Sequence, residues 1–177
     1  MRLIPRVEYR AMPWKNGRGT TTEIYAHPPD LPNFDWRVSI AAVSDDGAFS
    51  SFAGYERHIM LLSGNGMKLE IAGQEAVILQ LHQPFSFSGD ANVTAHLTDG
   101  PVIDFNLMVR RDFGIGQLRL QTKHETGEFG SDSSCLLIHA IDGDSFYLYA
   151  GERAQFTHPS YLAICEVTPV LRPAKAQ

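Results

Sequence analysis

The fold class of this chain is indicated most clearly by residues 58–71, which read HIMLLSGNGMKLEI. Two apolar or alternating runs, His58–Ser63 and Met67–Ile71, lie on either side of a Gly-Asn-Gly turn. Alternation of apolar and polar residues with a period of two is typical of a β-strand. An Asn-Gly pair between two such runs is a strong hairpin signal, because both central residues of a type I′ turn need positive φ. The segment therefore predicts two consecutive strands joined as a hairpin.

The same pattern continues in both directions along the chain. The runs expected to form strands are Thr20–Tyr25, Trp36–Val43, His58–Ser63, Met67–Ile71, Glu75–Leu79, Val93–Thr98, Asp104–Val109, Gly116–Gln121, Ser134–Ile141, Ser145–Tyr149, Ala154–Phe156 and Tyr161–Val167. They recur about every ten residues and are separated by turn residues, whereas helix signals are scarce. The sequence thus predicts an all-β protein, a sandwich, barrel or jelly roll, rather than a fold of βαβ units.

Length, composition and charge limit the classes of function. The chain has 177 residues, of which 44% are hydrophobic and 20% charged, as in an ordinary globular protein. Its net charge of −5 comes without a run of Lys or Arg, so we expect no nucleic-acid partner. No apolar run is long enough for a membrane span and residues 1–9 contain no apolar leader, so we expect a cytoplasmic protein without a membrane partner. The two cysteines, Cys135 and Cys165, are expected as buried thiols rather than as a disulfide.

Residues 12–23, MPWKNGRGTTTE, form the first segment in which chemistry could reside. The segment is not a phosphate-binding P-loop, since Lys15 precedes the glycines. It offers a glycine-containing turn with an aromatic plate at Trp14, a cation at Lys15, an amide at Asn16 and hydroxyls such as Thr21. These groups could line a pocket for a carboxylate or an amide ligand. The alternative is that Trp14 only caps the core, Lys15 is solvated and the threonines are ordinary strand residues.

Residues 34–41, FDWRVSIA, form the second segment. Side chains alternate across a strand, so Arg37 and Ser39 share one face, while Trp36 and Val38 share the other. If the aliphatic face packs into the core, Arg37 and Ser39 point to solvent. If the small polar face lines a barrel cavity, Arg37 becomes an anchor for an anion. The sequence alone leaves both arrangements open.

Residues 99–108, DGPVIDFNLM, form the third segment, in which Asp104 and Asn106 share one face of an apolar strand. A buried amide without a partner costs about 1–3 kcal/mol. Asn106 therefore either satisfies a buried backbone group or serves a ligand. The same two alternatives hold for Asp104, for which Arg37 or Arg57 is a plausible partner.

These three segments, with two further motifs, resemble the signature of the HutD/Ves family. The matching stretches are Pro13–Gly17 with Gly19, Thr20 and Glu23; Phe34–Ala41; Asp46–Ser50 with Gly54 and Arg57; Pro84, Phe85 and Phe87 with Gly89 and Asp90; and Asp104–Met108. The resemblance covers residues 3–110, and the remainder agrees in length and strand pattern. The short C-terminal half makes the chain more similar to Ves than to HutD.

The resemblance implies a cupin-like, RmlC-type jelly-roll barrel with two fused cupin units in one chain. A coarse likeness between residues 59–71 and 135–149 agrees with such a duplication. We therefore expect one compact bicupin unit over residues 1–177, with an N-terminal half at 1–110 and a C-terminal half at 111–177. The family implies a link to histidine utilisation through HutD and to cold or stress response through Ves. It implies no established reaction, although HutD-like proteins are suspected of binding a small acid such as formylglutamate.

Metal and catalytic signatures are missing from the sequence. Metal-binding cupins resemble one another in a His-x-His pair followed by a carboxylate and a later His. The seven histidines of this chain are scattered singly, so we expect neither a metal nor another cofactor. The GxSxG motif is absent as well. Acid–base chemistry stays open, with Glu23, His58 and Asp104 as the candidate catalytic residues, but we favour a protein that is not an enzyme.

The hypothesis that follows is a metal-free protein that binds or senses a small anionic or amide-bearing metabolite. The residues expected to contact this metabolite provide charge, hydrogen bonds and an apolar wall, and they are Lys15 and Arg37; Asn16, Thr21, Ser39 and Asn106; and Trp14. One alternative is a metal-independent isomerase-type enzyme that uses Glu23 or His58 as a base on a small sugar or amino-acid derivative. The other is a non-catalytic interaction module, which could form a homodimer through an exposed sheet.

Overall fold

β-Strands make up nearly all of the regular structure. The computed structural model describes all residues except 15–16, 18, 31–32, 122–126, 157–160 and 171–177. The elements are β1 (Arg2–Ile4), the short 3-10 helix η1 (Arg6–Glu8), β2 (Arg10–Pro13), β3 (Gly19–His27), β4 (Trp36–Val43), β5 (Gly47–Ala48), β6 (Tyr55–Ser63), β7 (Met67–Ile71), β8 (Val77–Leu79), β9 (Phe85–Ser88), β10 (Val93–Leu97), β11 (Val102–Arg110), β12 (Gly114–Gln121), β13 (Gly127–Gly130), β14 (Cys135–Ala140), β15 (Ser145–Leu148), β16 (Arg153–Phe156) and β17 (Leu162–Pro169). No α-helix occurs in the described residues, so the all-β prediction is confirmed. In the same residues, no helix is long and apolar enough to cross a membrane.

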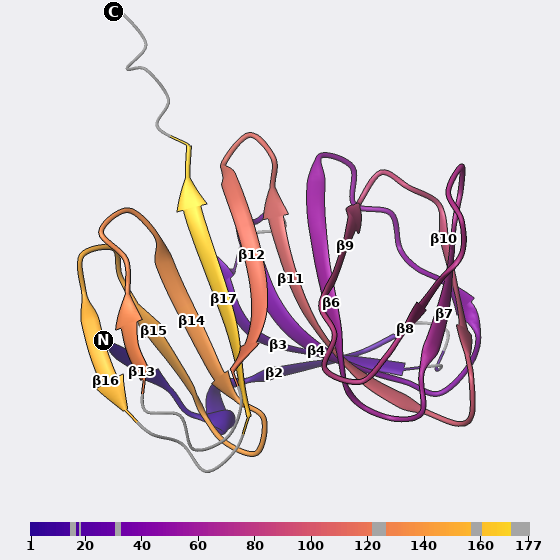
Figure 1. The fold of residues 1–177 in the computed structure, drawn as a ribbon, viewed down its shortest axis with the longest axis horizontal. Coiled ribbons are helices and arrows are strands. Elements are labelled where there is room, and N and C mark those ends of the chain that lie inside the picture. The colour runs from indigo at the N-terminus through magenta and orange to yellow at the C-terminus, as the bar shows by residue number, and fades with distance from the viewer. Residues whose placement is uncertain (15–16, 18, 31–32, 122–126, 157–160, 171–177) are drawn as a thin grey trace, which may run out of the picture.

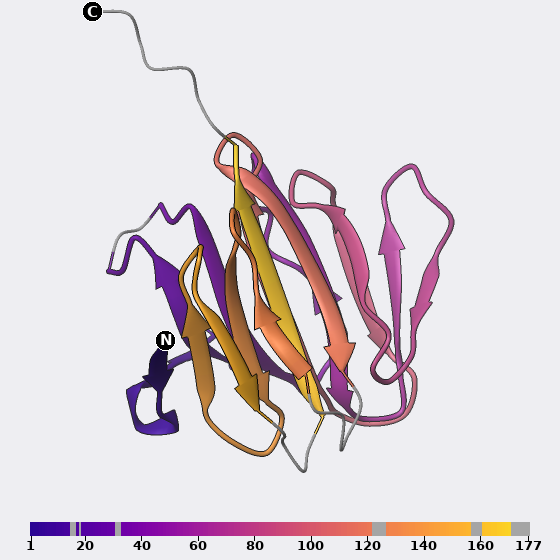
Figure 2. The ribbon, with the colours of Figure 1, turned by 60° about the vertical axis from the view of Figure 1, so that its left-hand side comes forward.

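The described strands form three large sheets and one small ribbon. The central sheet has the order β2-β3-β4-β11-β6-β9. It lies between a four-stranded sheet, β5-β10-β7-β8, on the right of Figure 1 and a five-stranded sheet, β1-β15-β14-β17-β12, on the left. The view of Figure 2 shows the strands of the five-stranded sheet running side by side in front of the central sheet. Strands β13 and β16 pair as a separate ribbon at the far left of Figure 1.

Both faces of the central sheet are buried, and this explains the mixed composition of its strands. On β11, Phe105 and Leu107 point toward the five-stranded sheet and belong to a core with Leu137 and Cys165. Their neighbours on β11 point the other way, because side chains alternate along a strand. A second core, between the central and four-stranded sheets, contains residues such as Ile59 of β6, Leu69 of β7 and Ala95 of β10.

This arrangement decides the orientation of residues 34–41. Trp36 and Val38 belong to the core against the five-stranded sheet, where Trp36 packs on Tyr25 with ring centroids 4.8 Å apart. Arg37 and Ser39 therefore face the four-stranded side. The aliphatic face does pack into a core, yet the polar face does not point to bulk solvent. Both alternatives in the sequence analysis treat one face of this strand as the interior. The structure instead covers both faces of the strand.

The hairpin predicted for residues 58–71 is wrong. Strand β6 pairs with β11 and β9, whereas β7 pairs with β10 and β8, so the two runs belong to different sheets. Positive φ occurs at Gly64 (103°) and Gly66 (124°), not at Asn65, so the turn is not of type I′. A Cβ at Gly64 would lie 2.7 Å from Val102 Cγ1, so the chain crosses between sheets where only glycine fits.

The N-terminal strand crosses the expected boundary between the two halves. In β1, Leu3 pairs with Phe146 of β15, so residues 2–4 belong to the sheet that the C-terminal strands form. The division at residue 110 into two cupin units stays a proposal, and this pairing places the first residues of the chain with the second unit. Both cysteines are free thiols, with Cys165 buried and Cys135 partly buried.

Candidate functional site

Strand register builds a polar surface on the four-stranded side of the central sheet. In one row across the sheet, Arg37 of β4 pairs with Met108 of β11, and Met108 pairs with Arg57 of β6. In the next row, two residues along, Ser39 pairs with Asn106. Paired residues on neighbouring strands are about 5 Å apart and residues two positions apart share a face. The sheet therefore gathers polar side chains from three strands into one patch.

A cavity of about 480 Å³ lies over this patch. Its lining is formed by Met12, Pro13, Trp14, Thr21, Arg37, Ser39, Ala41, Val43, Ala48, Phe49, Ser50, Phe52, Arg57, Asp104, Asn106 and Met108. Five of the predicted ligand-binding residues are in this lining: Trp14, Thr21, Arg37, Ser39 and Asn106. Asp104, a catalytic candidate, joins them. The other two predicted ligand-binding residues, Lys15 and Asn16, lie outside the described residues.

Arg37 is held by aromatic and sulfur contacts rather than by an acid. Its guanidinium carbon lies 4.6 Å from the ring centroid of Phe34 and 5.4 Å from that of Phe52. One terminal nitrogen donates to Met108 Sδ at 3.4 Å, and the buried Nε has no hydrogen-bond partner. Burial lowers the pKa of Arg37, and the charge of Glu23 partly offsets that effect. The side chain is thus a cation with unused hydrogen-bonding capacity.

Arg57 has a similar environment on the other side of Met108. Its guanidinium carbon lies 4.8 Å from the ring centroid of Phe87, 5.1 Å from that of Phe49 and 5.6 Å from that of Phe52. A terminal nitrogen donates to a backbone oxygen, that of Ser50, at 3.3 Å, and the buried Nε has no partner. Burial lowers the pKa of Arg57 to about 10, with Asp104 acting against the shift. The guanidinium therefore stays charged at neutral pH.

Neither guanidinium is neutralised by an ion pair within the part of the chain that the structure describes. The charge of Arg37 also lowers the pKa of Arg57, which shows that the two cations act on each other. Burying like charges without counter-ions is unfavourable. The cavity therefore carries an excess of positive charge that a bound anion would neutralise.

Asp104 is the acidic group of the cavity lining. It is 2% exposed, and one of its oxygens accepts a hydrogen bond from the Asn106 amide. Burial raises the pKa of Asp104 to about 7, although the Asn106 hydrogen bond and the charge of Arg57 act in the opposite direction. This carboxyl therefore carries a proton for a large part of the time at neutral pH. The buried amide of Asn106, for which the sequence requires a partner, thus donates to Asp104.

The loop that closes the cavity is tied to the β9–β10 turn. The backbone of Phe52 donates to Gly89 O at 2.8 Å, and Gly89 in turn donates to Tyr55 O at 2.8 Å. The Gly54 amide donates to the carboxylate of Asp90 at 2.9 Å. A Cβ at Gly89 would lie 2.4 Å from the Phe52 carbonyl oxygen, so the approach requires glycine. These contacts fix Phe52, whose ring faces both arginines.

The β2–β3 segment supplies a further wall. The Trp14 indole N–H donates to Thr21 Oγ1 at 2.8 Å, which fixes the ring and occupies the hydroxyl. A Cβ at Gly19 would lie 2.8 Å from Trp14 Cε3, so the ring packs directly against the backbone of β3. Trp14 thus lines the cavity and also packs against the neighbouring core. The two alternatives for this residue, a ligand wall and a cap on the core, are both compatible with its position.

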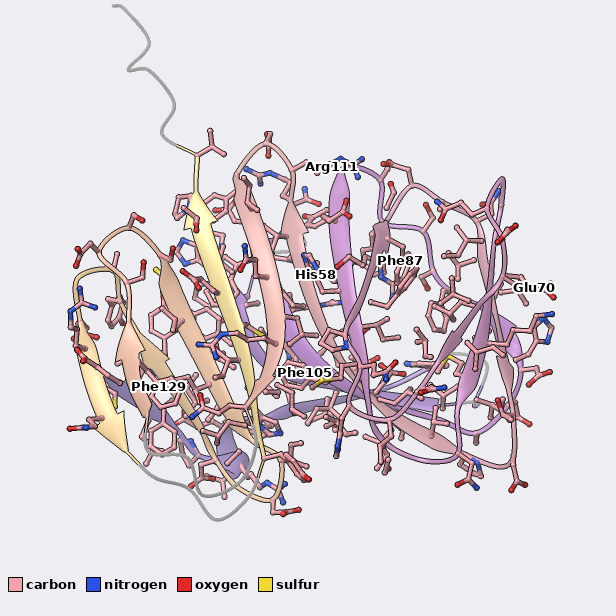
Figure 3. All side chains as sticks on the ribbon, in the orientation of Figure 1. His58, Glu70, Phe87, Phe105, Arg111 and Phe129 are labelled. Carbon is pink, nitrogen blue, oxygen red and sulfur yellow. The ribbon has the colours of Figure 1, made fainter. Side chains whose placement is uncertain are left out.

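The remaining acid–base candidates lie outside the cavity lining. Glu23 is 14% exposed and forms an ion pair with Arg10 at 2.9 Å. His58 is on the opposite face of β6 from Arg57, where its Nδ1 lies 2.7 Å from Ser86 Oγ. Figure 3 shows His58 toward β12 and Phe87 on the other side of β6. Period-two alternation explains the difference, because neighbours on a strand point to opposite faces.

Several cavity residues were not predicted as ligand contacts. The sequence predicts Arg57 only as a partner for an acidic side chain, because its neighbours Glu56 and His58 are also polar and give it no distinct signal. The aromatic residues Phe49 and Phe52 come from a loop, which has no periodicity to show where its side chains point. No group of three or more His, Cys, Asp or Glu side chains able to hold a metal ion occurs among the described residues.

Comparison with known proteins places the chain in a family. Residues 6–166 match the family model described as HutD. The chain belongs to the HutD family. An uncharacterized 21.2 kDa protein in the hutC 3′ region of Pseudomonas putida is 37% identical over 156 residues, 88% of this chain and 81% of that protein. Protein Ves of Citrobacter koseri is 40% identical over 135 residues, 74% of this chain and 70% of that protein.

Solved structures support the same placement. The conserved protein of unknown function PA5104 from Pseudomonas aeruginosa PAO1 has a TM-score of 0.71 and 34% identity, covering 95% of this HutD-family chain and 92% of that one. HutD from Pseudomonas fluorescens SBW25, solved in a formate condition, has a TM-score of 0.71 and 30% identity, and the match covers 97% of this chain and 99% of that one. The predicted HutD/Ves membership is confirmed. Because relatives of both names match at similar identity, the predicted leaning toward Ves has little support.

Proposed function

We propose that this HutD-family protein binds or senses a small anionic metabolite, and that the cavity over the central sheet is its binding site. The observation that carries the proposal is the pair of buried cations, Arg37 and Arg57, which face the cavity with unpartnered Nε atoms and without an ion pair among the described residues. A buried charge is tolerated when it is paired and hydrogen-bonded. A carboxylate or phosphate would accept hydrogen bonds from both guanidinium groups.

The size and the remaining polar groups of the cavity agree with a small metabolite. Small-molecule sites typically enclose about 300–1,000 Å³ and combine apolar walls with a few polar groups. Here the volume is about 480 Å³, the aromatic rings of Phe49 and Phe52 form walls, and the hydroxyl of Ser39 and the amide of Asn106 can contact an amide or a second oxygen of the ligand. The open volume argues against a filled barrel that would act only as an interaction module.

The names of two relatives suggest where such a ligand could come from. One is called HutD and another is named for its position in the hutC 3′ region. We therefore propose a histidine-utilisation metabolite as one class of candidate, and a ligand linked to cold or stress response as another, since Ves is also a relative. The cytoplasmic location and the two-unit cupin architecture expected from the sequence remain part of the proposal.

A thermal-shift screen of the purified protein tests this proposal. The panel contains small carboxylic acids including histidine-pathway intermediates, their amides, sugar phosphates and divalent metals. At 100 times its Kd, a ligand stabilises the folded state by about 2.7 kcal/mol, which is about 5–10 °C for a protein of this size. The proposal expects a shift with at least one organic anion. Shifts with metals alone, or with no compound in the panel, would contradict it.

Matched variants locate the binding. Arg37→Met and Arg57→Met each remove one cavity cation while keeping an unbranched side chain, and either should weaken anion binding about 30-fold or more, because losing a buried charged partner costs about 2–5 kcal/mol. Arg119→Met makes the same charge change on the exposed face of β12 and should leave the affinity unchanged. Equal losses in all three variants would show that the anion does not bind in the cavity.

A second candidate function, metal-independent isomerase-type catalysis, is favoured by one observation. Asp104 lies in the cavity with a pKa raised to about 7 by burial, which suits a group that exchanges a proton at neutral pH. The test is deuterium exchange from D₂O into a bound compound, followed by proton NMR. Exchange that is lost in Asp104→Asn would support catalysis, whereas binding without exchange would favour the binding function.

A further inference from the structure

Asp104 occupies a position in which an ionised carboxylate would weaken the proposed binding. It is in the cavity lining and belongs to the same surface as the two arginines. Yet it forms no ion pair with Arg37 or Arg57 in the described structure, where it accepts a hydrogen bond from the Asn106 amide. A carboxylate there would repel an anionic ligand, whereas a neutral carboxyl would offer an O–H donor.

We propose that the cavity takes up its anionic ligand together with one proton, which is carried by Asp104, so that the neutral carboxyl donates a hydrogen bond to the ligand while Arg37 and Arg57 supply the positive charge. This inference rests on the proposed function, because it concerns the same cavity and the same class of ligand. The proton comes from solvent and no covalent bond of the ligand changes. Asp104 is then a residue that selects ligands able to accept a hydrogen bond.

The charges around Asp104 are consistent with this arrangement. Arg57 of β6 and Arg37 of β4 are the cations in the described lining. On β3, the charge of Glu23 acts on Arg37, and Glu23 is itself held by Arg10 of β2. Arg57, whose charge acts on Asp104, has a pKa of about 10 and therefore stays charged at every pH between 6 and 8.

The loop opposite the sheet brings no further ionisable group to the cavity. Its described lining residues, Ala48, Phe49, Ser50 and Phe52, are neutral. His58, whose pKa is lowered by burial, lies on the other face of β6. Asp104 is therefore the one group in the described cavity lining that gains or loses a proton near neutral pH, where burial places its pKa at about 7.

The consequence is a dependence of affinity on pH. Below pH 7 the free protein already holds the proton, so binding needs no uptake. Above pH 7 the carboxylate must be protonated first, and the Kd of an anion rises up to tenfold for each pH unit. A neutral ligand of the same shape has no such requirement, because it does not repel the carboxylate.

The experiment uses acetate and its neutral isostere acetamide as probes of the full-length protein. The chain has two tryptophans, and the indole N–H signals of a ¹⁵N-labelled sample report separately on the cavity and on the core. Trp14 lines the cavity, whereas Trp36 is buried on the other face of the central sheet and serves as the internal control. Each probe is titrated at pH 6 and pH 8 at constant ionic strength.

The expected result is a Kd for acetate that is about tenfold higher at pH 8 than at pH 6, with an unchanged Kd for acetamide. In Asp104→Asn, which keeps the shape of the side chain, the Kd for acetate should change less than twofold between the two pH values. Calorimetry of the wild-type protein in two buffers of different ionisation enthalpy should show nearly one proton taken up per acetate at pH 8 and almost none at pH 6. This measurement decides the matter if the variant does not fold.

The outcomes separate this inference from the proposed function. Acetate that moves the Trp14 signal with the same Kd at both pH values, or without proton uptake, would overturn the proton-coupled mechanism and leave anion binding intact. A pH dependence that persists in Asp104→Asn would assign the proton to another group and overturn it as well. If acetate leaves the Trp14 signal unmoved at both pH values, anion binding in the cavity fails, and the coupling fails with it.

Discussion

Replacing Arg57 by methionine should make the ligand-free protein more stable. The ordinary pKa of an arginine is 12.5 and that of Arg57 falls to about 10 through burial. One pKa unit corresponds to about 1.4 kcal/mol, so holding this charge in the fold costs about 3 kcal/mol. Because the pKa of the folded state lies below that of the unfolded state, the cost is fully present below about pH 10 and is relieved only at higher pH.

Part of this gain is offset by contacts that methionine cannot make. The guanidinium lies over the rings of Phe49, Phe52 and Phe87, and for one buried cation these contacts together contribute about 1–2 kcal/mol. Asp104 also loses a favourable charge, but it can respond by staying protonated. The net expectation for Arg57→Met is an increase of about 1–2 kcal/mol in the free energy of unfolding.

The assay is equilibrium unfolding in urea, a neutral denaturant, at pH 7 without added anions that could occupy the cavity, supported by a thermal scan. A gain of about 1–2 kcal/mol raises Tm by about 2–8 °C in a protein of this size. Arg119→Met, the exposed control, should stay within about 0.5 kcal/mol of the wild type. If Arg57→Met is instead less stable by more than about 1 kcal/mol, the reasoning that Arg57 is an unneutralised charge kept for ligand binding is refuted.

The remaining predictions concern pH and the cavity loop. The pKa of Asp104 is raised to about 7, so the folded state keeps a proton that the unfolded state loses. Wild-type stability should therefore fall relative to Asp104→Asn by about 3 kcal/mol as pH rises from 4 to 7; parallel pH curves from chemical denaturation would contradict this. Burial lowers the pKa of His139 to about 4, so wild-type stability should fall relative to His139→Phe by about 3 kcal/mol as pH drops from 6.5 to 4, and the same titration checks the opposite sign. Gly89→Ala brings a Cβ to 2.4 Å from the Phe52 carbonyl oxygen, so it should lower the free energy of unfolding by about 1–3 kcal/mol and weaken anion binding. Gly47→Ala is the control, because nothing lies within 4 Å of the new Cβ, and it should have neither effect. Equal unfolding midpoints for the two variants would show that the loop can shift freely.

Local sequence patterns were sufficient to predict most of the strands and many of the residues of the candidate site. Runs such as Trp36–Val43 and Asp104–Val109 alternate strongly enough to identify both the strand and its two faces. The short strands β1 and β2 were missed, because Arg2–Ile4 and Arg10–Pro13 are too short to show a period. They are strands because a neighbouring strand offers hydrogen bonds, which is a property of the tertiary structure.

The candidate site shows the same limit at the level of single residues. Arg37, Ser39 and Asn106 stand out as polar residues on apolar strands, and this is visible in the sequence. Phe52 does not stand out, since a loop residue acquires its position from contacts such as the one between its amide and Gly89 O. Nor does the sequence separate Arg57 from His58, because the choice depends on which face of β6 meets the cavity.

By itself, the sequence determined that the chain is all-β, where its longer strands run and which residues share a face, because these depend on a period of two and on turn residues within a few positions. Only the tertiary structure decided which strands are neighbours. Residues 58–71 carry a strong local hairpin signal, yet β6 and β7 belong to different sheets, since burying both faces of the central sheet stabilises the whole chain more than one local turn does. The pairing of β11 with both β4 and β6 places Arg37 and Arg57 beside Met108, and Asp104 lines the same cavity. The spacing of these residues along the chain does not predict that they lie together.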